Sequence, residues 1–496
     1  MESGTQKMVP RKWLCFITVA LGTFAAYSDA SMVNIALPSI GRHFEADISV
    51  VEAIVTFYLL MLTGLVIIFG RLADIYGRKR LYTTGFVIFI LASALCGMAP
   101  SFWLLALLRS LQGIGAAMLL ANGSAIVTAS FPKTERGKAL GALGSVIAIS
   151  VILGPIVSGF LSEHFGWRAV FYVNVPIVIV GFVLGIKALP PDSSGHDRER
   201  FDVKGAIAYL AFLACFLMLL NTLSTTDQRA AVPAAALAGA ILFGAGFIVI
   251  ESRVEHPLLD TGLFRRRAFG AAAVSSFLSF WATSATSFLL PFYLERVLRL
   301  SPTKSGYIFM PIALFLVVFA PLGGNLADRF GTRAICTTGA LINCLGLVCL
   351  STLSAETSAF GVILRMIPFG IGSGLFQPPN NSSMMGAVPA NRLGIASGMI
   401  SAIKNFGSMS GVAVTSLVFT LVQTGALERL RSTGLDTEAA EREAFISGLR
   451  VMFLISAAIC SVAVITSFVR GEEKTGRDPG EPVAGRLQYE TEQSAR

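Results

Sequence analysis

Long apolar segments separated by short polar ones dominate the chain from Trp13 to Phe468. An α-helix needs about 20 apolar residues to cross the roughly 30 Å hydrocarbon core of a bilayer, and about fourteen segments of this length follow one another. The pattern predicts an all-α integral membrane protein. The expected helices are centred near Thr23, Leu60, Ile90, Leu111, Ile149, Ile179, Cys215, Leu242, Phe280, Val317, Asn343, Gly370, Gly407 and Ala458.

A short polar motif occurs twice, each time at the end of an apolar segment. It reads GRLADIYGRKR from Gly70 and GNLADRFGTR from Gly324, so both copies share the order Gly-x-Leu-Ala-Asp-x-aromatic-Gly. Further along, each copy is followed by an arginine inside an apolar segment and then by two glycines; these arginines are Arg109 and Arg365. With both motifs on one side of the membrane, the repeat predicts two parallel halves related by an axis along the membrane normal.

The repeat divides the chain into four parts. Residues 1–189 and 268–470 are the predicted six-helix halves, and residues 190–267 hold a polar linker with two extra apolar helices. These two helices, at about residues 205–250, carry few polar residues, which favours a lipid-facing or linking hairpin over a substrate site. The charged stretch DTEAAEREAFISGL before the last apolar segment suits a short surface helix, and the polar residues 471–496 are expected to be a disordered tail.

Composition agrees with lipid as the main solvent of the chain, because 54% of the residues are hydrophobic, 14% are charged and the mean hydropathy is +0.70. The net charge of +9 is mostly a topology signal, since short loops rich in Lys and Arg stay in the cytoplasm. With the N-terminus inside, 26 of the 39 Lys and Arg fall in predicted cytoplasmic segments, 10 in external ones and three within the membrane. Both termini are therefore expected in the cytoplasm, and no basic surface for nucleic acid is expected.

Enzymatic and metal-binding chemistry has no signature in the sequence. The seven cysteines and four histidines show no spacing typical of a metal site or a disulfide framework. No GxxxxGK[ST] phosphate loop occurs, which argues against ATP as the energy source. The sequence thus predicts a protein that is not an enzyme and that uses no cofactor and no metal.

Several further strings occur in order along the chain: SDASMVNIALP from Ser28, LLRSLQGIGAA from Leu107, LGPIVSGFL from Leu153, WRAVFYVNVP from Trp167 and SAIKNFGSMSG from Ser401. With the first polar motif, they make about residues 10–470 resemble the major facilitator superfamily, and more narrowly its fourteen-helix drug–proton antiporters. The resemblance implies a major facilitator fold with two six-helix halves and two extra central helices. It also implies alternating access driven by the proton gradient.

Asp29 lies about two thirds along the first predicted helix, where an acid is costly and usually functional. A carboxyl group that is neutral when buried away from water and ionised when exposed to water can carry a proton, and the resemblance implies this role for Asp29. The alternative is a structural acid that is held by a hydrogen bond or by a nearby cation. Arg109 stays charged and needs a partner or water. The resemblance associates Arg109 with proton transfer, and Gln112 lies beside it on the predicted helix. The alternative is that the Arg109 side chain extends to the end of the helix and places its charge in water.

The repeated motif is interpreted as a latch between helix ends at the cytoplasmic side. Carboxylates near helix ends can accept backbone donors or pair with arginines, and glycines let backbones approach. The second copy has Asn325 and Thr332 where the first has Arg71 and Arg78, so its role is less defined, and an ordinary charged turn kept for topology is the alternative. The latch candidates are Gly70, Arg71, Asp74, Gly77, Arg78, Asp328 and Arg333.

Small residues line the fifth predicted helix. Gly154, Pro155 and Gly159 permit close helix contact and a weakened backbone, and they resemble the antiporter motif of the family. Ser150 and Ser158 stand where that motif has glycines, which weakens the implication that this protein is an exporter. The alternative is that the small residues serve only close helix packing and say nothing about the direction of transport. The related string PLGGNLAD in the tenth helix predicts that the fifth and tenth helices meet between the halves.

The candidate substrate contacts carry little charge. Asp29 is the only acid that the sequence places deep in a helix, against three deep bases; if Lys404 faces the cavity, neutral, anionic or monocationic amphiphiles are favoured over dications. A structural role for Lys404 is the alternative. The candidate contacts are Asn34, Gln112, Asn122, Trp281, Arg365, Phe376, Gln377, Asn380, Asn381, Lys404 and Asn405.

Taken together, the residues and the resemblance predict a proton-coupled secondary transporter in the cell inner (plasma) membrane that exports small amphipathic molecules. Its expected partners are the substrate, protons and the lipid bilayer, with no nucleic acid and no obligatory protein partner. A dedicated exporter of one metabolite or lipid-like molecule, or a proton symporter, is the alternative within transport. A membrane receptor or enzyme is the remote alternative.

Overall fold

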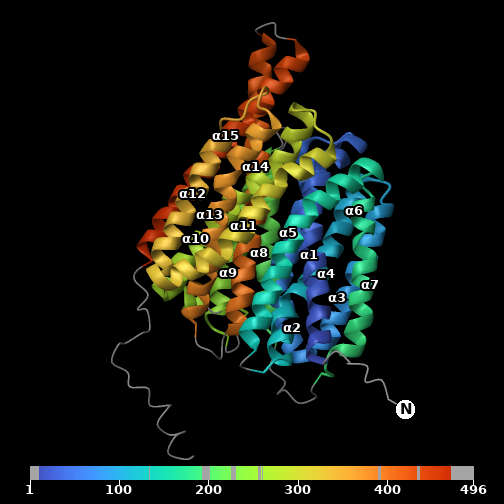
Figure 1. The fold of residues 1–496 in the computed structure, drawn as a ribbon, viewed down its shortest axis with the longest axis vertical. Coiled ribbons are helices and arrows are strands. Elements are labelled where there is room, and N and C mark those ends of the chain that lie inside the picture. Colours follow the sequence, from blue (N-terminus) through green and yellow to red (C-terminus); the bar gives the residue numbers. More distant parts are fainter. Residues whose placement is uncertain are drawn as a thin grey trace, which may run out of the picture.

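The computed structural model of the protein is a bundle of helices (Figure 1), and among the residues that it describes, fourteen helical segments are long and apolar enough to cross a membrane. This confirms the all-α membrane architecture that the apolar segments predict. The structure describes residues 11–132, 135–192, 201–224, 231–254, 258–259, 261–388, 393–432 and 436–470. The predicted tail at residues 471–496 lies outside this described part.

The first half of the chain provides six spanning segments, the last of which is formed by α6 and α7 together. Within it, α1 packs against α4, α5 and α7, while α2 and α3 both pack against α4. These helices are α1 (Arg11–His43), α2 (Ile48–Tyr76), α3 (Arg78–Met98), α4 (Phe102–Ser130), α5 (Arg136–His164), α6 (Ala169–Tyr172) and α7 (Asn174–Ala188).

The second half repeats this pattern, with α11 and α12 both packed against α13 and with α10 packed against α14 and α15. Two further helices, α8 (Val203–Ser224) and α9 (Ala231–Glu251), stand between the halves in the chain. The elements of the second half are η1 (Thr261–Arg265), α10 (Arg267–Phe292), η2 (Tyr293–Val297), α11 (Pro302–Phe330), α12 (Thr332–Leu350), α13 (Ala359–Gly386), α14 (Leu393–Ser432) and α15 (Thr437–Val469).

The two copies of the polar motif lie at the α2–α3 and α11–α12 junctions, at the end of the bundle where α1 begins and α15 ends (Figure 1). We call this end the motif end and the opposite end the distal end. The last glycine of each copy adopts positive φ, +105° at Gly77 and +84° at Gly331. Only glycine takes this conformation without strain, which explains why both copies carry glycine at the turn.

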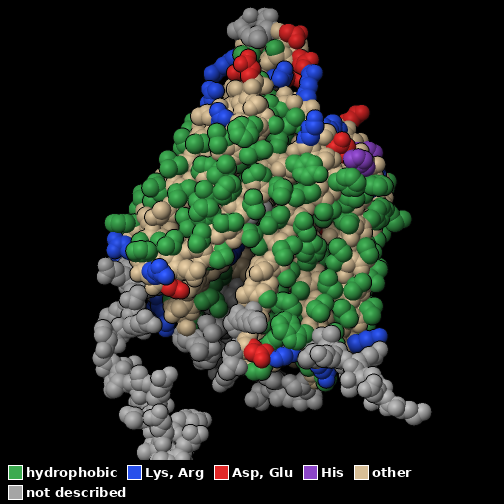
Figure 2. Space-filling model, viewed as in Figure 1, with side chains coloured by type: hydrophobic (Ala, Val, Ile, Leu, Met, Phe, Trp, Pro, Cys, Tyr) green, Lys and Arg blue, Asp and Glu red, His purple; other side chains and the backbone are tan. Residues whose placement is uncertain are grey.

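The halves contact each other at the distal end and separate toward the motif end. Buried side chains from both halves, such as Val33 and Phe102 in the first and Phe288 and Met452 in the second, form one apolar cluster at the distal end. Toward the motif end, the buried side chains form clusters that belong mainly to one half each. Figure 2 shows a hollow between the two halves in its lower part, which is the side of the motif end.

The extra helix α8 contacts both halves. The hydroxyl of Tyr209 donates to the carbonyl of Thr63 in α2 at 3.4 Å, and the rings of Phe212 and Phe216 lie 5.9 and 5.4 Å from that of Phe406 in α14. Helix α9 packs against α8 and is mostly exposed. The hairpin thus links the halves through α8 and presents α9 to the surroundings.

The charged stretch that begins at Thr437 is the first part of α15 and not a separate surface helix. The spans α14 and α15 have 40 and 33 residues, more than the roughly 20 that cross a bilayer, so they extend beyond the other helices at the distal end (Figure 1). Arg299 forms an ion pair with Glu438 in this extension. No proline interrupts α15, and its charged first turns therefore continue directly into the apolar span.

Candidate functional site

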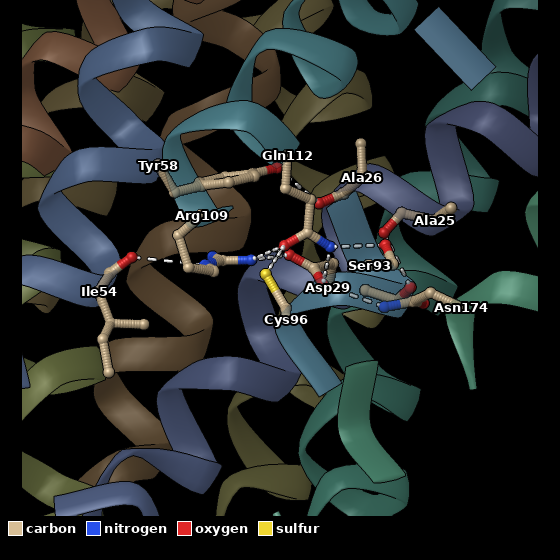
Figure 3. A network of polar contacts seen from close by, with 11 residues as sticks. Ala25, Ala26, Asp29, Ile54, Tyr58, Ser93, Cys96, Arg109, Gln112 and Asn174 are labelled. Atoms are coloured by element: carbon tan, nitrogen blue, oxygen red, sulfur yellow. Dashed lines mark hydrogen bonds and ion pairs between the residues drawn. The ribbon is translucent and has the colours of Figure 1, made fainter. Parts of the chain in front are cut away.

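A buried polar network surrounds Asp29 in the first half (Figure 3). Asp29 in α1 is fully buried, and its Oδ2 accepts a hydrogen bond from Nη1 of Arg109 at 2.5 Å. Its Oδ1 accepts from Nε2 of Gln112 at 2.9 Å and from Nδ2 of Asn174 at 3.0 Å. One carboxylate therefore connects α1 to both α4 and α7.

Arg109 is 1% exposed, so the guanidinium stays inside the half and does not reach the helix end. Its Nη1 also donates to Oε1 of Gln112 at 2.5 Å, and its Nε approaches the carbonyl of Ile54 in α2 at 3.4 Å. The guanidinium lies over the ring of Tyr58, 4.2 Å from the centroid, which is a cation–π arrangement. The cation is therefore held by α1, α2 and its own helix.

Two members of this network were missed by sequence reasoning. Ser93 in α3 accepts from Nε2 of Gln112 at 2.8 Å, and Asn174 opens α7 beside Asp29. The only signal for Asn174 is its place in the string WRAVFYVNVP, whereas a serine within an apolar helix is common on packing faces and gives no signal. With them, the network spans α1, α2, α3, α4 and α7.

Arg365, the repeat counterpart of Arg109, has a different environment. Its Nε donates to Oγ1 of Thr352 at 2.9 Å, and its Nη1 donates to the carbonyl of Gly361 at 3.0 Å. Helix α10, the counterpart of α1, contains no Asp or Glu, so no buried carboxylate is offered from there. The structure directs Arg365 to the α12–α13 connection at the distal end, away from the interior.

The first polar motif holds the segment that follows α7. The backbone amides of Lys79 and Arg80 donate to Oδ1 and Oδ2 of Asp192 at 2.8 and 3.1 Å, an anion position that suits a helix N-terminus. The side chain of Lys79 donates to the carbonyl of Ile186 at 2.8 Å. Asp192 was not a sequence candidate. The side chain of Asp74 lies outside the described part, so its pairing stays a prediction.

The second motif is arranged differently. Asp328 is exposed, and the guanidinium of Arg333 lies over the ring of Phe468, 4.3 Å from the centroid. In the first copy, Arg71 and Arg78 are half-buried. The contacts made at the two junctions therefore differ, although both junctions share the same glycine turn.

Replacing Gly77 by alanine is expected to lower the melting temperature of the purified protein by several degrees. A Cβ at this residue would be strained at φ +105° and would collide with the side chain of Asp192; backbone strain of this kind costs about 1–3 kcal/mol. Gly70 has no neighbouring atom within 4 Å of such a Cβ, so Gly70→Ala is the matched control with little expected change. Equal melting temperatures for the two variants would contradict the assignment of a strained turn.

Helix α5 is in close backbone contact with both halves. A Cβ on Gly154 would lie 2.7 Å from that of Ser31 in α1, and one on Gly159 would collide with the backbone of Pro302 in α11. The carbonyl of Pro155 meets a glycine of α11. The expectation that the fifth and tenth spanning helices meet between the halves is confirmed, because α5 and α11 are packed together.

Three of the substrate candidates are used within the structure. Asn122 donates to the carbonyl of Met118 in its own helix at 2.9 Å. Phe376 is buried against α12. Asn380 donates to the carbonyl of Ala272 at 3.1 Å and accepts from Arg470, a buried arginine that was not among the sequence candidates. These contacts favour structural roles for all three.

The remaining substrate candidates differ in burial. Trp281 is buried in the distal cluster. Lys404 has its Nζ 5.3 Å from the centroid of the Phe280 ring in α10, and no carboxylate of the described residues forms an ion pair with it. It is thus a cation inside the bundle without a buried counter-charge. The half-buried candidates are Asn34, Gln377, Asn381, Lys404 and Asn405.

Asp29 is not the only buried acid of the described residues, although the others lie near helix ends and not deep in a helix. Glu52 in α2 is 9% exposed and Glu295 in η2 is 5% exposed. Glu295 accepts a hydrogen bond from Arg42 at 2.7 Å, which connects the end of α1 to the second half. Both acids lie near the distal ends of their helices, where an acid in the sequence is expected to face water.

Similar proteins are membrane transporters. Residues 19–412 match the sequence profile of the Major Facilitator Superfamily. The riboflavin transporter RibZ of Clostridioides difficile is 32% identical, over 94% of this chain and 99% of that protein. The multidrug resistance protein Stp of Mycobacterium tuberculosis is 29% identical over 94% of each chain. The tetracenomycin C resistance and export protein of Streptomyces glaucescens is 27% identical, over 95% of this chain and 94% of that protein.

Solved transporter structures share the fold. A bacterial homologue of the human lysosomal transporter Spinster, in an inward-facing and unoccupied conformation, superposes with a TM-score of 0.66 over 93% of this chain and 97% of that chain, at 15% identity. The peptide transporter PepTSo gives a TM-score of 0.65 over 93% of this chain and 99% of that chain, also at 15% identity. At this identity the likeness concerns the fold alone.

Proposed function

Since the chain belongs to the major facilitator superfamily, as its motifs predict, we propose that this multi-pass membrane transporter is a proton-coupled exporter of small amphipathic molecules. The family and the similar proteins are transporters and not enzymes. Proton exchange for substrate and the alternating opening of the two ends are the parts that we add. The proposal places the protein in the cell inner membrane with the motif end and both termini in the cytoplasm, as the distribution of Lys and Arg predicts.

The observation that carries the proposal is the buried ion pair between Asp29 and Arg109. A proton on Asp29 would remove the charge that attracts Arg109 and would change the hydrogen bonds to Gln112 and Asn174. These bonds connect α1 to α4 and α7, so one proton would alter the packing of several helices at once. Such a group can link protonation to a change of conformation.

Alternating access is supported by the asymmetry of the bundle. The halves share one apolar cluster at the distal end and part toward the motif end, and a hollow lies between them there (Figure 2). In the proposed orientation this arrangement is open to the cytoplasm, the side from which an exporter takes its substrate. Rocking of one half against the other would then open the distal end.

The proposed function can be tested with purified protein in proteoliposomes that contain a pH-sensitive dye. A broad panel of amphipathic compounds, including riboflavin and tetracenomycin C, is added to one side. At least one compound is expected to cause a substrate-dependent proton flux. No proton flux with any compound, from protein that is verified to be folded and inserted, would contradict the proposal.

A transporter dedicated to one metabolite is the second candidate. The similarity to a riboflavin transporter over nearly the full length of both chains favours it, although other similar proteins are a multidrug resistance protein and an antibiotic export protein. The same compound panel separates the two functions. Flux with a single chemical class favours the dedicated transporter, and flux with several unrelated classes favours multidrug export.

Substrate charge provides a further prediction. Of the three bases that the sequence places within the membrane, Arg109 is neutralised by Asp29 and Arg365 faces the distal connection, which leaves Lys404 without a carboxylate partner among the described residues. We expect neutral, anionic or monocationic compounds to be transported at least about tenfold faster than rigid dications, because a second positive charge near Lys404 would lack a partner. Matched monocationic and dicationic dyes are compared in the same vesicles, with Lys404→Gln as the variant expected to reduce the difference. Equal rates for both dyes in the unmodified protein would contradict this prediction.

A further inference from the structure

A buried carboxyl group lies in the seam between the halves at the distal end, where α2 packs against α14. Glu52 in α2 accepts a hydrogen bond from Oγ1 of Thr56, one turn along the same helix, at 2.7 Å. Across the seam its carboxyl group faces Ser416 of α14. The hydroxyl of Ser416 is buried and directed at this carboxyl group, and the hydroxyl of its neighbour Thr415 is buried without a hydrogen-bond partner among the described residues. The seam thus holds one acid and buried hydroxyl groups on the opposite helix.

No ion pair among the described residues includes Glu52. Arg109 of α4 is paired with Asp29 of α1, and Arg42 of α1 is paired with Glu295. The guanidinium of Arg296 in η2 lies beside Gly41 and Val51 at the distal end. On α14, Lys404 lies 12 positions before Ser416, about 18 Å along the helix. Helices α3 and α8 carry their charged residues only at the motif end.

An ionised carboxylate buried without a cation is strongly unfavourable, whereas a protonated one can share hydrogen bonds with hydroxyl groups. The closed seam therefore suits the neutral form of Glu52, and the ionised form requires water. We propose that Glu52 is a second proton-binding site and that its protonation from the distal side closes the seam between α2 and α14. This inference adds to the proposed proton coupling, and its test measures conformation and not transport.

The two acids would then have separate tasks. Asp29 is surrounded by donors, with Arg109, Gln112 and Asn174 all directed at it within one half. The hydrogen-bonding groups that the structure gives Glu52 are the hydroxyls of Thr56 and Ser416, and Ser416 belongs to the other half. Protonation of Asp29 changes contacts inside the first half, whereas protonation of Glu52 decides whether the two halves can meet.

The test measures the width of the distal end with spin labels on Ser101→Cys and Glu356→Cys, two exposed loop positions at the distal end of the first and second halves. Pulsed electron paramagnetic resonance gives the distance distribution at pH 5 and pH 9 in lipid nanodiscs, without substrate. The parent protein with its native cysteines serves as the blank. We expect a shift from short to long distances as the pH rises, by up to about tenfold in the ratio of closed to open forms per pH unit for one proton.

Three variants assign this shift. Glu52→Gln mimics the protonated acid and is expected to stay closed at both pH values, whereas Glu52→Asp keeps a titrating carboxyl group and restores the response. Asp29→Asn is expected to retain a pH-dependent shift. The proposal is overturned if Glu52→Gln keeps the full shift, if the shift disappears in Asp29→Asn and not in Glu52→Gln, or if the unmodified protein shows none. Because no substrate is present, failure of the proposed transport function would not produce any of these results.

Discussion

Asp29→Asn is expected to lower proton-driven transport in inside-out vesicles by at least about a hundredfold, since removal of a group that carries the proton abolishes coupling. The asparagine keeps the size of the side chain and one carbonyl oxygen for the donors around it, but it cannot bind or release a proton. Arg109 retains its contacts with Gln112, Ile54 and Tyr58. The loss is therefore expected in coupling and not in folding.

Substrate exchange without a proton gradient separates these two effects. Asp29→Asn is expected to exchange labelled for unlabelled substrate at a rate near that of the unmodified protein, because exchange requires no net proton movement. Asp436→Asn makes the same chemical change at an exposed residue whose side chain forms no cap hydrogen bond, and it serves as the control. Undiminished proton-driven transport by Asp29→Asn would show that another group carries the proton.

Arg109→Ala is expected to lower the free energy of unfolding by about 3–5 kcal/mol, because loss of one partner leaves the other charge buried and unpaired. Arg365→Ala is the matched control from the second copy of the repeat. Its guanidinium binds a hydroxyl and a carbonyl at the distal end, so the expected loss is at most about 1.5 kcal/mol. Denaturant titration in detergent micelles, with circular dichroism as the signal, measures both.

A double variant tests whether the loss comes from the ion pair. In the Asp29→Asn background the carboxylate is absent, so Arg109→Ala is expected to cost less than it does in the unmodified protein. An equal cost in both backgrounds would mean that Arg109 stabilises the half through its contacts with Tyr58 and Ile54. A similar loss for Arg109→Ala and Arg365→Ala would contradict the difference in environment that the structure assigns to them.

The sequence predicts the helices and the repeat well because both are local properties. Apolar length alone identifies the spans, and the aspartate and arginine of the central pair stand out because few charges occur inside apolar segments. The turn glycines Gly77 and Gly331 occupy the same position in the two copies of the motif, so the repeat in the sequence already pairs them. The charged start of α15 shows the limit of this reasoning, since polarity there looks like a surface helix although the backbone continues without a break.

Contacts between distant segments could not be predicted from the same signals. Glu52 lies within two turns of the start of α2, where an acid normally faces water, and its burial comes from α14, more than 300 positions later in the chain. Asn174 appears as an ordinary residue at a helix start until α7 is placed against α1. The environment of Arg365 depends on the lack of an acid in α10, which becomes meaningful only when the two halves are compared helix by helix.

The dependence of substrate accumulation on the pH difference across the membrane tests proton-coupled export most directly. Proteoliposomes with a fixed orientation, an imposed series of pH differences and a clamped membrane potential are brought to a steady state with a neutral substrate. For exchange of one proton for one substrate, we predict that the ratio of substrate concentrations rises about tenfold per pH unit, with substrate accumulating on the side of higher proton concentration. A ratio that does not change with the pH difference, or that rises on the side of lower proton concentration, would contradict proton antiport.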